Sequence, residues 1–418
     1  MLAVLIATWP LLVGVMLLLV GNGMQSSLLG IRGAIEGFST LEISAVMSCY
    51  YVGYLAGSRM VPEMIQRVGH VRVFAALGSI ISALIVCYPV LPDWMAWSLM
   101  RVLIGFSFSG VYITAESWLN NTSSNETRGQ ALSLYMIVQM IGIISSQMLL
   151  NLGDPGGFGL FVLPSVLVSV AFIPILLTVT AAPTFETTER LPFRRLYEVS
   201  PLGVVGMFLS GGIFSAMFGM ASVWGTVAGL SVAQISVFIA AIYAGGLVLQ
   251  YPIGWLSDRM DRRLVICGVA VVGAVAMLIA IFLPVNLWFL VPAAVVLGGV
   301  ANPLYALLIA HTNDFLAKDQ MAGASAGLLF MNGLGAIAGP PITGWMMDRM
   351  GQSGFFVFIF VLMSLVAAYA AFRMTQRNAP NPEETGNFAV MAPMAAPVAV
   401  GGLMEEAGQD TAATVEPR

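Results

Sequence analysis

An arginine stands inside a long apolar stretch of the chain, at a depth where a bilayer would surround it. Arg101 follows Trp94 by seven residues, which is about 10 Å along a helix. A charge at that depth is costly and normally faces a water-filled cavity or a partner. Its guanidinium could bind an anionic solute through paired hydrogen bonds, or hold a nearby carboxylate in its ionised form. The alternative is a side chain that only snorkels back to the membrane surface.

A carboxylate follows in the same apolar stretch. Glu116 lies fifteen residues after Arg101, about 60° around one helix at 100° per residue. Near the membrane surface it could pair with Arg67 or Arg128 and hold helix ends together as a cytoplasmic gate. It could also carry a proton, or be a plain surface acid. We favour the gate.

Amide side chains are the remaining groups that could line a solute cavity. Asn22 and Gln25 are spaced i, i+3 and therefore share a helix face. Gln139 and Asn332 occupy matching places in two apolar stretches. The alternative is that each amide only bonds neighbouring helices together, because buried amides need partners in hydrocarbon. We predict that Arg101, Asn22, Gln25, Gln139 and Asn332 form the substrate or coupling site.

The composition of the chain indicates that membrane helices hold these groups. Of 418 residues, 58% are hydrophobic and 9% are charged, whereas a soluble protein carries roughly 25% charged residues. The mean hydropathy is +0.90, and a spanning helix needs about 20 apolar residues. We therefore predict an all-α polytopic membrane protein with twelve transmembrane helices in two six-helix pseudo-repeats. The apolar runs are 3–29, 41–60, 71–90, 94–118, 129–151, 158–180, 200–225, 231–255, 264–283, 287–311, 322–345 and 352–372.

The same composition excludes several classes of protein. The net charge is −4 and Lys318 is the single lysine, so no nucleic-acid partner is expected. The three cysteines lie far apart and only two histidines occur, which predicts no disulfide framework, no metal and no cofactor. The first 30 residues lack a basic segment and a cleavage site, and so predict a spanning helix rather than a removable signal. No Walker A motif is present, so ATP is not the immediate energy source.

The positions of the arginines predict the orientation of the helices. With a cytoplasmic N-terminus and twelve crossings, 14 of the 17 Arg and Lys residues fall in cytoplasmic segments, 2 fall outside and 1 lies within a helix, as the positive-inside rule requires. Both termini are therefore predicted to be cytoplasmic. The predicted parts are an N-terminal six-helix half (1–180), a cytoplasmic linker (181–199), a C-terminal six-helix half (200–373) and a disordered cytoplasmic tail (374–418).

Two loops repeat one another at a shift of 192 residues. The segment 254–263 reads G-W-L-S-D-R-M-D-R-R, and the segment 62–72 reads P-E-M-I-Q-R-V-G-H-V-R, with Gln66 in place of the acid. We predict that Asp258 latches the cytoplasmic helix ends of the second half through Arg259 and neighbouring helix ends. The alternative is a solvated turn acid. The predicted cytoplasmic gate consists of Asp258, Arg259, Arg262, Arg67 and Glu116.

These motifs resemble those of the major facilitator superfamily over residues 1–373. The family's loop signature is G-x-x-x-D-R-x-G-R-R/K, and 254–263 fits it with Asp261 in place of the second Gly. The segment 101–105 is similar to the family's R-x-x-x-G element, and 116–118 (E-S-W) looks like the YcaD-type bacterial branch. The resemblance implies alternating access of two halves and a proton gradient as the energy source. It also implies that the acid of the run 94–118, Glu116, pairs with the loop arginines.

We therefore predict a secondary active transporter of a small solute in the bacterial inner (plasma) membrane. The solute would be a metabolite, a sugar or a drug, moved by efflux or uptake. Protons, the lipid bilayer and the small-molecule substrate are its expected partners, and the protein is expected to be a monomer that is not an enzyme. The alternatives are a non-transporting receptor or sensor, and a membrane-embedded enzyme, which would need clustered acids, histidines or a nucleophile at one depth.

Overall fold

The computed structural model describes residues 2–122, 127–176, 191–376 and 388, and this part of the chain contains helices and no strand. Most of the predicted tail (374–418) and the predicted linker residues 181–190 lie outside the described residues. The helices are α1 (Leu2–Ile35), α2 (Thr40–Val68), α3 (His70–Cys87), α4 (Trp94–Thr122), α5 (Arg128–Leu149), η1 (Leu150–Leu152), α6 (Gly159–Leu176), α7 (Phe193–Val199), α8 (Pro201–Ser215), η2 (Ala216–Met220), α9 (Ala221–Val227), α10 (Val232–Ser257), α11 (Arg262–Phe282), α12 (Leu287–Asn313), α13 (Lys318–Met350) and α14 (Ser353–Met374).

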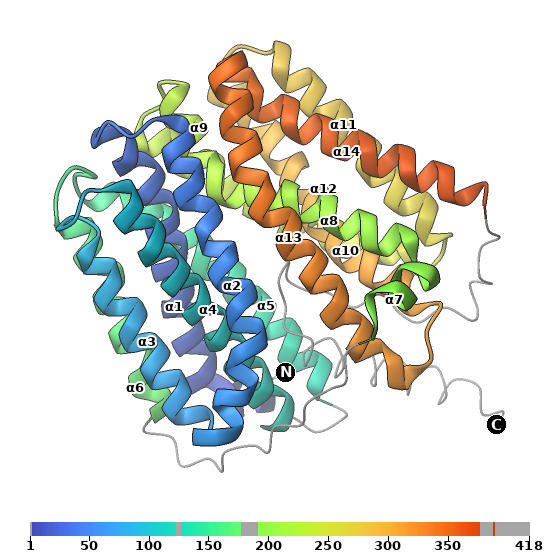
Figure 1. Ribbon diagram of the computed structural model, residues 1–418, viewed down its shortest axis with the longest axis horizontal. Helices are drawn as coiled ribbons and strands as arrows, with labels where there is room; N and C mark the ends of the chain where they lie inside the picture. Colours follow the sequence, from blue (N-terminus) through green and yellow to red (C-terminus); the bar gives the residue numbers. More distant parts are fainter. Residues whose placement is uncertain (1, 123–126, 177–190, 377–387, 389–418) are drawn as a thin grey trace.

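The helices form two groups, which Figure 1 shows side by side. The first group contains α1–α6 and the second contains α8–α14. Because consecutive long helices run in opposite directions, their connections alternate between two ends of the molecule. We call the end with α7 and the connections at 68–70 and 257–262 the α7 end. The opposite end carries the connections at 35–40 and 350–353.

Ten helical segments in the described part of the chain are long and apolar enough to cross a membrane. α2 and α6 complete the predicted twelve. α2 is less apolar because it carries Tyr50, Tyr51 and Tyr54, and the apolar stretch of α6 is shorter, Gly159–Pro174. The predicted all-α polytopic fold is thus confirmed.

Several helices differ from the sequence-based expectation. α1 continues past the predicted end at 29 to Ile35, and α13 continues past 345 to Met350. α2 continues past the predicted end at 60 to Val68, and Gly69, with a φ of 87°, ends it and turns the chain into α3. The predicted helix 200–225 is interrupted by η2, a π-helical turn. Such turns are rare single turns inside α-helices. They do not change the hydropathy of the run, so hydropathy alone does not reveal them.

The two groups repeat one close helix crossing, between α2 and α4 and between α10 and α12. A Cβ atom on Gly53 or Gly105 would lie 1.8 Å or 1.9 Å from a backbone carbonyl oxygen of the facing helix. A Cβ atom on Gly245 or Gly298 would lie 2.0 Å or 1.7 Å from the corresponding carbonyl oxygens. Small residues let membrane helices approach closely. Gly245 follows Gly53 at the 192-residue shift of the loop repeat.

The two groups contact each other along α2 and α13. Ser48 donates a hydrogen bond to the carbonyl oxygen of Ile337 at 2.6 Å, and the Arg59 guanidinium lies 4.5 Å from the centroid of the Phe330 ring. Nearer the α7 end, the Arg67 side chain is 79% exposed. The two helices therefore diverge toward the α7 end, as Figure 1 shows.

Candidate functional site

Arg101 lies in the interior of the first helix group and is 1% exposed. Its Nη2 donates to Met47 Sδ at 3.7 Å. Its Cζ lies 4.7 Å from the centroid of the Tyr50 ring, a cation–π geometry. Its Nε and Nη1 have no hydrogen-bond partner. The snorkelling alternative is wrong, because a snorkelling guanidinium would reach the surface of the protein.

The close crossing of α2 and α4 places these groups together. Because Gly105 has no side chain, the Tyr50 backbone packs directly on α4 one turn beyond Arg101. The aromatic ring of Tyr50 therefore covers the guanidinium from the neighbouring helix. The R-x-x-x-G spacing thus places the glycine where the neighbouring helix can approach Arg101.

A chain of hydrogen bonds continues from Tyr50 into α1 and back to α4. Gln25 Nε2 donates to Asn22 Oδ1 at 3.1 Å, which confirms that these two residues share a helix face. Asn22 Nδ2 lies 3.4 Å from the Tyr50 hydroxyl oxygen and 3.2 Å from that of Tyr112, as donor to both. Gln25 Oε1 is buried without a partner. The structure thus joins two of the predicted site residues to the surroundings of Arg101.

Glu116 is buried on α4, at 2% exposure. The Tyr135 hydroxyl donates to its Oε1 at 3.2 Å. Arg67 instead pairs with Glu63 at 3.9 Å, and both of those side chains are exposed. Glu116 therefore does not pair with Arg67 and is not a surface acid, while its pairing with Arg128 and its role in a gate stay predictions. The side chain of Arg128, the other expected partner, lies outside the described part of the structure.

The two remaining amides lie apart from this chain of hydrogen bonds. Asn332 is fully buried on α13, where its Nδ2 donates to the carbonyl oxygen of Met207 on α8 at 3.3 Å. Gln139 is buried on α5. No hydrogen bond between described side chains joins either residue to Asn22 or Gln25. The Nδ2 of Asn332 thus links α13 to α8 by a hydrogen bond, while its Oδ1 has no hydrogen-bond partner.

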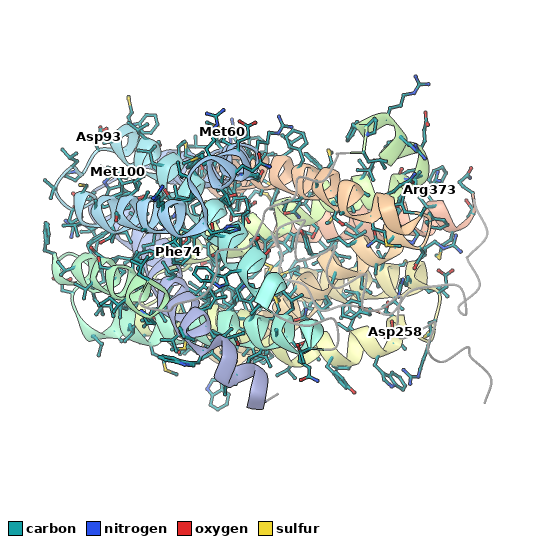
Figure 2. All side chains as sticks on the ribbon, turned by 90° about the horizontal axis from the view of Figure 1, so that it is seen from below. Met60, Phe74, Asp93, Met100, Asp258 and Arg373 are labelled. Carbon is teal, nitrogen blue, oxygen red and sulfur yellow. The ribbon has the colours of Figure 1, made fainter. Side chains whose placement is uncertain are left out.

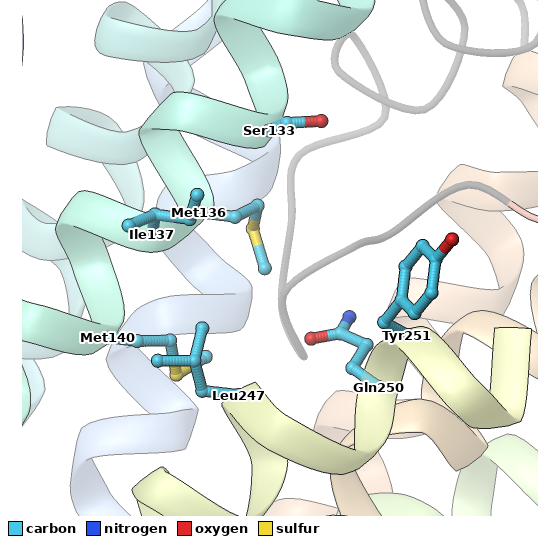
Figure 3. Close-up of a pocket in the computed structure, with 7 residues that line it drawn as sticks. All are labelled: Ser133, Met136, Ile137, Met140, Leu247, Gln250 and Tyr251. Atoms are coloured by element: carbon cyan, nitrogen blue, oxygen red, sulfur yellow. The ribbon is translucent and has the colours of Figure 1, made fainter.

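A pocket of about 190 Å³ lies between α5 and α10, one helix from each group. Figure 3 shows the lining side chains of the two helices on either side of it. The lining residues are Ser133, Met136, Ile137 and Met140 on α5 and Leu247, Gln250 and Tyr251 on α10. The Gln250 Nε2 has no partner. An apolar wall with a few polar groups is typical of small-molecule sites.

The loop signature of the second group is organised around Arg262. Its side chain is 4% exposed and pairs with Asp258 at 3.6 Å and with Asp314, which lies at the end of α12. Arg259 instead donates to the Trp255 carbonyl oxygen at 3.2 Å and lies over the indole ring. Asp258 therefore pairs with Arg262, and the expectation that it acts through Arg259 is wrong. Figure 2 shows Asp258 in the second helix group.

Asp261, the departure from the family signature, caps the start of α11. Its carboxylate accepts from the Arg263 backbone N–H at 3.0 Å and from Arg263 Nη2 at 2.8 Å. Burial raises the pKa of Asp261, but the hydrogen bonds and the charge of Arg263 outweigh it and lower the pKa below 3.8. An N-cap of this kind stabilises a helix start by about 1 kcal/mol.

The first copy of the loop signature works through a different contact. His70 lies 192 residues before Arg262, and its Nε2 is 3.0 Å from the Ser117 hydroxyl of α4. Both side chains are buried. The first copy therefore also ties the loop to a helix end, through a contact between an imidazole and a hydroxyl.

Sequence reasoning missed several members of these networks. Tyr50, Tyr112 and Tyr135 supply hydroxyl groups at the core of the site, and Asp314 completes the Arg262 network. The tail residue Phe388 donates its backbone N–H to Asp258 Oδ1 at 2.7 Å. For Tyr50 the available signal was the unusual tyrosine content of the apolar run 41–60. Nothing in the sequence indicated the contact of Phe388.

Comparison with known proteins identifies the family. The family model described as Major Facilitator Superfamily matches residues 11–263 and 203–406. The chain is 24% identical over 366 residues to the uncharacterized MFS-type transporter YcaD of Escherichia fergusonii, with 85% of this chain and 94% of that protein covered. It is 26% identical over 367 residues to an uncharacterized MFS-type transporter of Enterobacter sp. (strain 638), with the same coverage.

Solved structures share the fold. A variant of the nucleoside transporter NupG superposes with a TM-score of 0.73 at 14% identity, covering 88% of this chain and 99% of that one. A bacterial homologue of the human lysosomal transporter Spinster, in an inward-facing and occupied conformation, gives 0.71 at 14% identity, covering 88% and 98%. The chain is a multi-pass bacterial membrane protein of the YcaD branch. It belongs to the major facilitator superfamily and is a secondary transporter of a small molecule.

Proposed function

We propose that the chain moves its solute across the bacterial inner membrane by alternating access of the two helix groups, driven by a proton gradient. The solute leaves chemically unchanged, and the transporter works as a monomer without a cofactor or a nucleic-acid partner. The observation that supports proton coupling is Glu116, a carboxylate buried on the same helix as Arg101. Acids buried in membrane helices are costly and therefore rare, and those that occur mark ion or proton pathways.

The pocket between α5 and α10 supports an amphipathic solute. Met136, Met140 and Leu247 offer apolar surface, while Ser133 and the unpaired Gln250 amide offer hydrogen bonds. A solute with an apolar body and one or two polar groups fits such a lining. Drug-like compounds and lipophilic metabolites are therefore favoured over sugars, which would leave most of their hydroxyl groups unpaired.

Reconstituted vesicles test the coupling directly. Wild-type protein in liposomes, with a metabolite and drug mixture outside and a pH gradient imposed, should accumulate at least one compound measurable by mass spectrometry. Glu116→Gln should lose the gradient-driven accumulation about tenfold or more, since a neutral amide cannot take up a proton, but should still exchange the compound between the two sides.

The matched control is Glu63→Gln, because the Glu63 side chain is 71% exposed and should leave both measurements unchanged. Gradient-driven accumulation by Glu116→Gln at wild-type levels would rule out Glu116 as the coupling group. Binding of a compound without any movement into the vesicles would favour a receptor or sensor. A chemically altered compound would favour a membrane enzyme.

The proposed orientation places the α7 end in the cytoplasm, where the two helix groups diverge. Most described arginines lie at the α7 end, whereas the opposite end has, among the described residues, Arg32 in the last turn of α1 and Arg349 in the last turn of α13. Reporter fusions within α7 and at 257–262 should therefore read as cytoplasmic, and fusions at 153–158 and 283–286 as periplasmic. A periplasmic signal at α7 would overturn the orientation and the proposed division into two halves.

We also propose that Asp258 stabilises the α7 end of the second group as a latch. Asp258→Asn keeps the shape and removes the charge that faces Arg262. Transport should fall about five- to tenfold, as expected for the loss of about 1–1.5 kcal/mol, while insertion stays normal because Arg262 keeps Asp314. Initial uptake rates in vesicles measure this. The control is Asp348→Asn, because Asp348 is an exposed acid at the opposite end. If Asp258→Asn transports at the wild-type rate, Asp258 is a solvated turn acid and not a latch.

A further inference from the structure

Three arginines are buried among the described residues, and two of them face a carboxylate. Arg262 pairs with Asp258 and Asp314, and Arg263 pairs with Asp261 at 2.8 Å. Arg101 is the most deeply buried of the three, at 1% exposure. No ion pair among the described residues includes it. A buried guanidinium without a counter-charge is strongly unfavourable.

The side chains around Arg101 leave more polar groups without partners. The hydroxyl groups of Tyr51 and Tyr88 are buried and form no hydrogen bond. Tyr51 lies one turn after Met47 on α2, and Tyr88 packs on Trp97, one turn before Arg101 on α4. Trp97, which packs against Tyr88 with ring centroids 5.5 Å apart, has its own N–H satisfied by the carbonyl oxygens of Tyr88 and Leu91. Unpaired donor groups therefore remain on Arg101, Tyr51 and Tyr88.

All of these unpaired groups can donate a hydrogen bond. The Nε and Nη1 of Arg101 are donors only, and a tyrosine hydroxyl can turn its proton toward an acceptor. A positive charge surrounded by free donors is complementary to an anion and repels a cation. Because Arg101, Tyr51 and Tyr88 are each at most 1% exposed, an anion bound by them would have to be small and carry little or no hydration.

We propose that Arg101, Tyr51 and Tyr88 bind a chloride-sized monovalent anion, which serves as the counter-ion that the protein chain does not supply. The site uses the arginine that the proposed function also requires, but anion binding does not depend on transport of a solute. The anion would lie close to the contact between the two helix groups. Met47, which accepts from Arg101, also lies against Gly219 of η2, where an added Cβ would be 3.3 Å from the Met47 Cβ.

Thermal unfolding of the purified protein in detergent tests the site without any solute. Sodium chloride and sodium gluconate are compared at matched ionic strength, because gluconate is too large for a buried site. A ligand that binds only the folded state raises the unfolding temperature with increasing concentration. Wild type should show a chloride-dependent upward shift that is absent in gluconate, and bromide should reproduce it. Arg101→Gln should lose the shift.

The matched control is Arg349→Gln, an exposed arginine that also lies over an aromatic ring, at 5.9 Å from the centroid of Trp345. This variant should keep the full chloride shift. If Arg101→Gln does not fold, the double variant Tyr51→Phe, Tyr88→Phe removes the hydroxyl donors and should shift the chloride response to several-fold higher concentrations. Equal unfolding temperatures of wild type in chloride and gluconate would overturn the proposal, as would an unchanged chloride response in Arg101→Gln or in the double variant.

Discussion

Replacing Arg101 with Gln should reduce solute transport about ten- to a hundredfold, and replacing it with Lys should leave an intermediate rate. Hydrogen bonds from a charged group contribute about 1.5–3 kcal/mol each, and each 1.4 kcal/mol is about tenfold. Lys keeps the positive charge but lacks the planar guanidinium that stacks on the Tyr50 ring. Gln loses the charge and the stacking together. Initial uptake rates in vesicles, normalised to the amount of inserted protein, measure both variants.

The comparison of Lys with Gln separates two roles of the guanidinium. If only the electric field of Arg101 matters, Arg101→Lys should transport almost as well as wild type. If the shape of the guanidinium matters, Lys should fall well below wild type. Arg349→Gln is the control, because that arginine is exposed at the opposite end. Transport by Arg101→Gln at the wild-type rate would contradict a functional role for this buried charge.

The fold could be predicted from the sequence because membrane helices depend on a signal that is local. Each apolar run must satisfy its own backbone hydrogen bonds in lipid, so hydropathy alone indicated where helices lie. The 192-residue repeat was also visible, and the crossing of Gly53 with Gly105 returns as that of Gly245 with Gly298. The π-helical turn η2 was not visible, because a rare one-turn change of hydrogen bonding leaves the hydropathy of the run unchanged.

The site was predictable only in part, because depth in the membrane and direction around a helix are different quantities. The depth of Arg101 could be read from its distance to Trp94, but whether its side chain faces the surface or the interior depends on the crossing with α2. Arg262 and Asp314 are 52 residues apart, and no periodic pattern links them. Glu116 is buried and accepts from the Tyr135 hydroxyl of α5, a contact between residues 19 positions apart that the sequence did not indicate. Such pairings follow from tertiary packing.

The Gly53 position carries the largest expected effect on stability. In Gly53→Ala the new Cβ would lie 1.8 Å from the Val102 carbonyl oxygen and 2.9 Å from the Phe106 backbone nitrogen. Backbone atoms cannot rotate away as a side chain can, so α2 and α4 must separate. Overpacking in a tightly packed interior costs about 1–3 kcal/mol and occasionally more, and we expect about 3 kcal/mol here. Thermal unfolding in detergent should show a clearly lower midpoint.

Separation of α2 and α4 would also move the Tyr50 ring away from Arg101, so Gly53→Ala should impair transport beyond its effect on the amount of folded protein. Gly268→Ala is the matched control. Gly268 lies in α11 with open space around its Cα, and Ala is a better helix former than Gly by about 0.8–1 kcal/mol, so this variant should unfold at the same or a higher temperature. If Gly53→Ala unfolds at the same temperature as Gly268→Ala, α2 and α4 can accommodate a Cβ atom at their crossing. The geometry proposed for the arginine site would then lack its support, because the approach of the Tyr50 ring to Arg101 depends on that crossing.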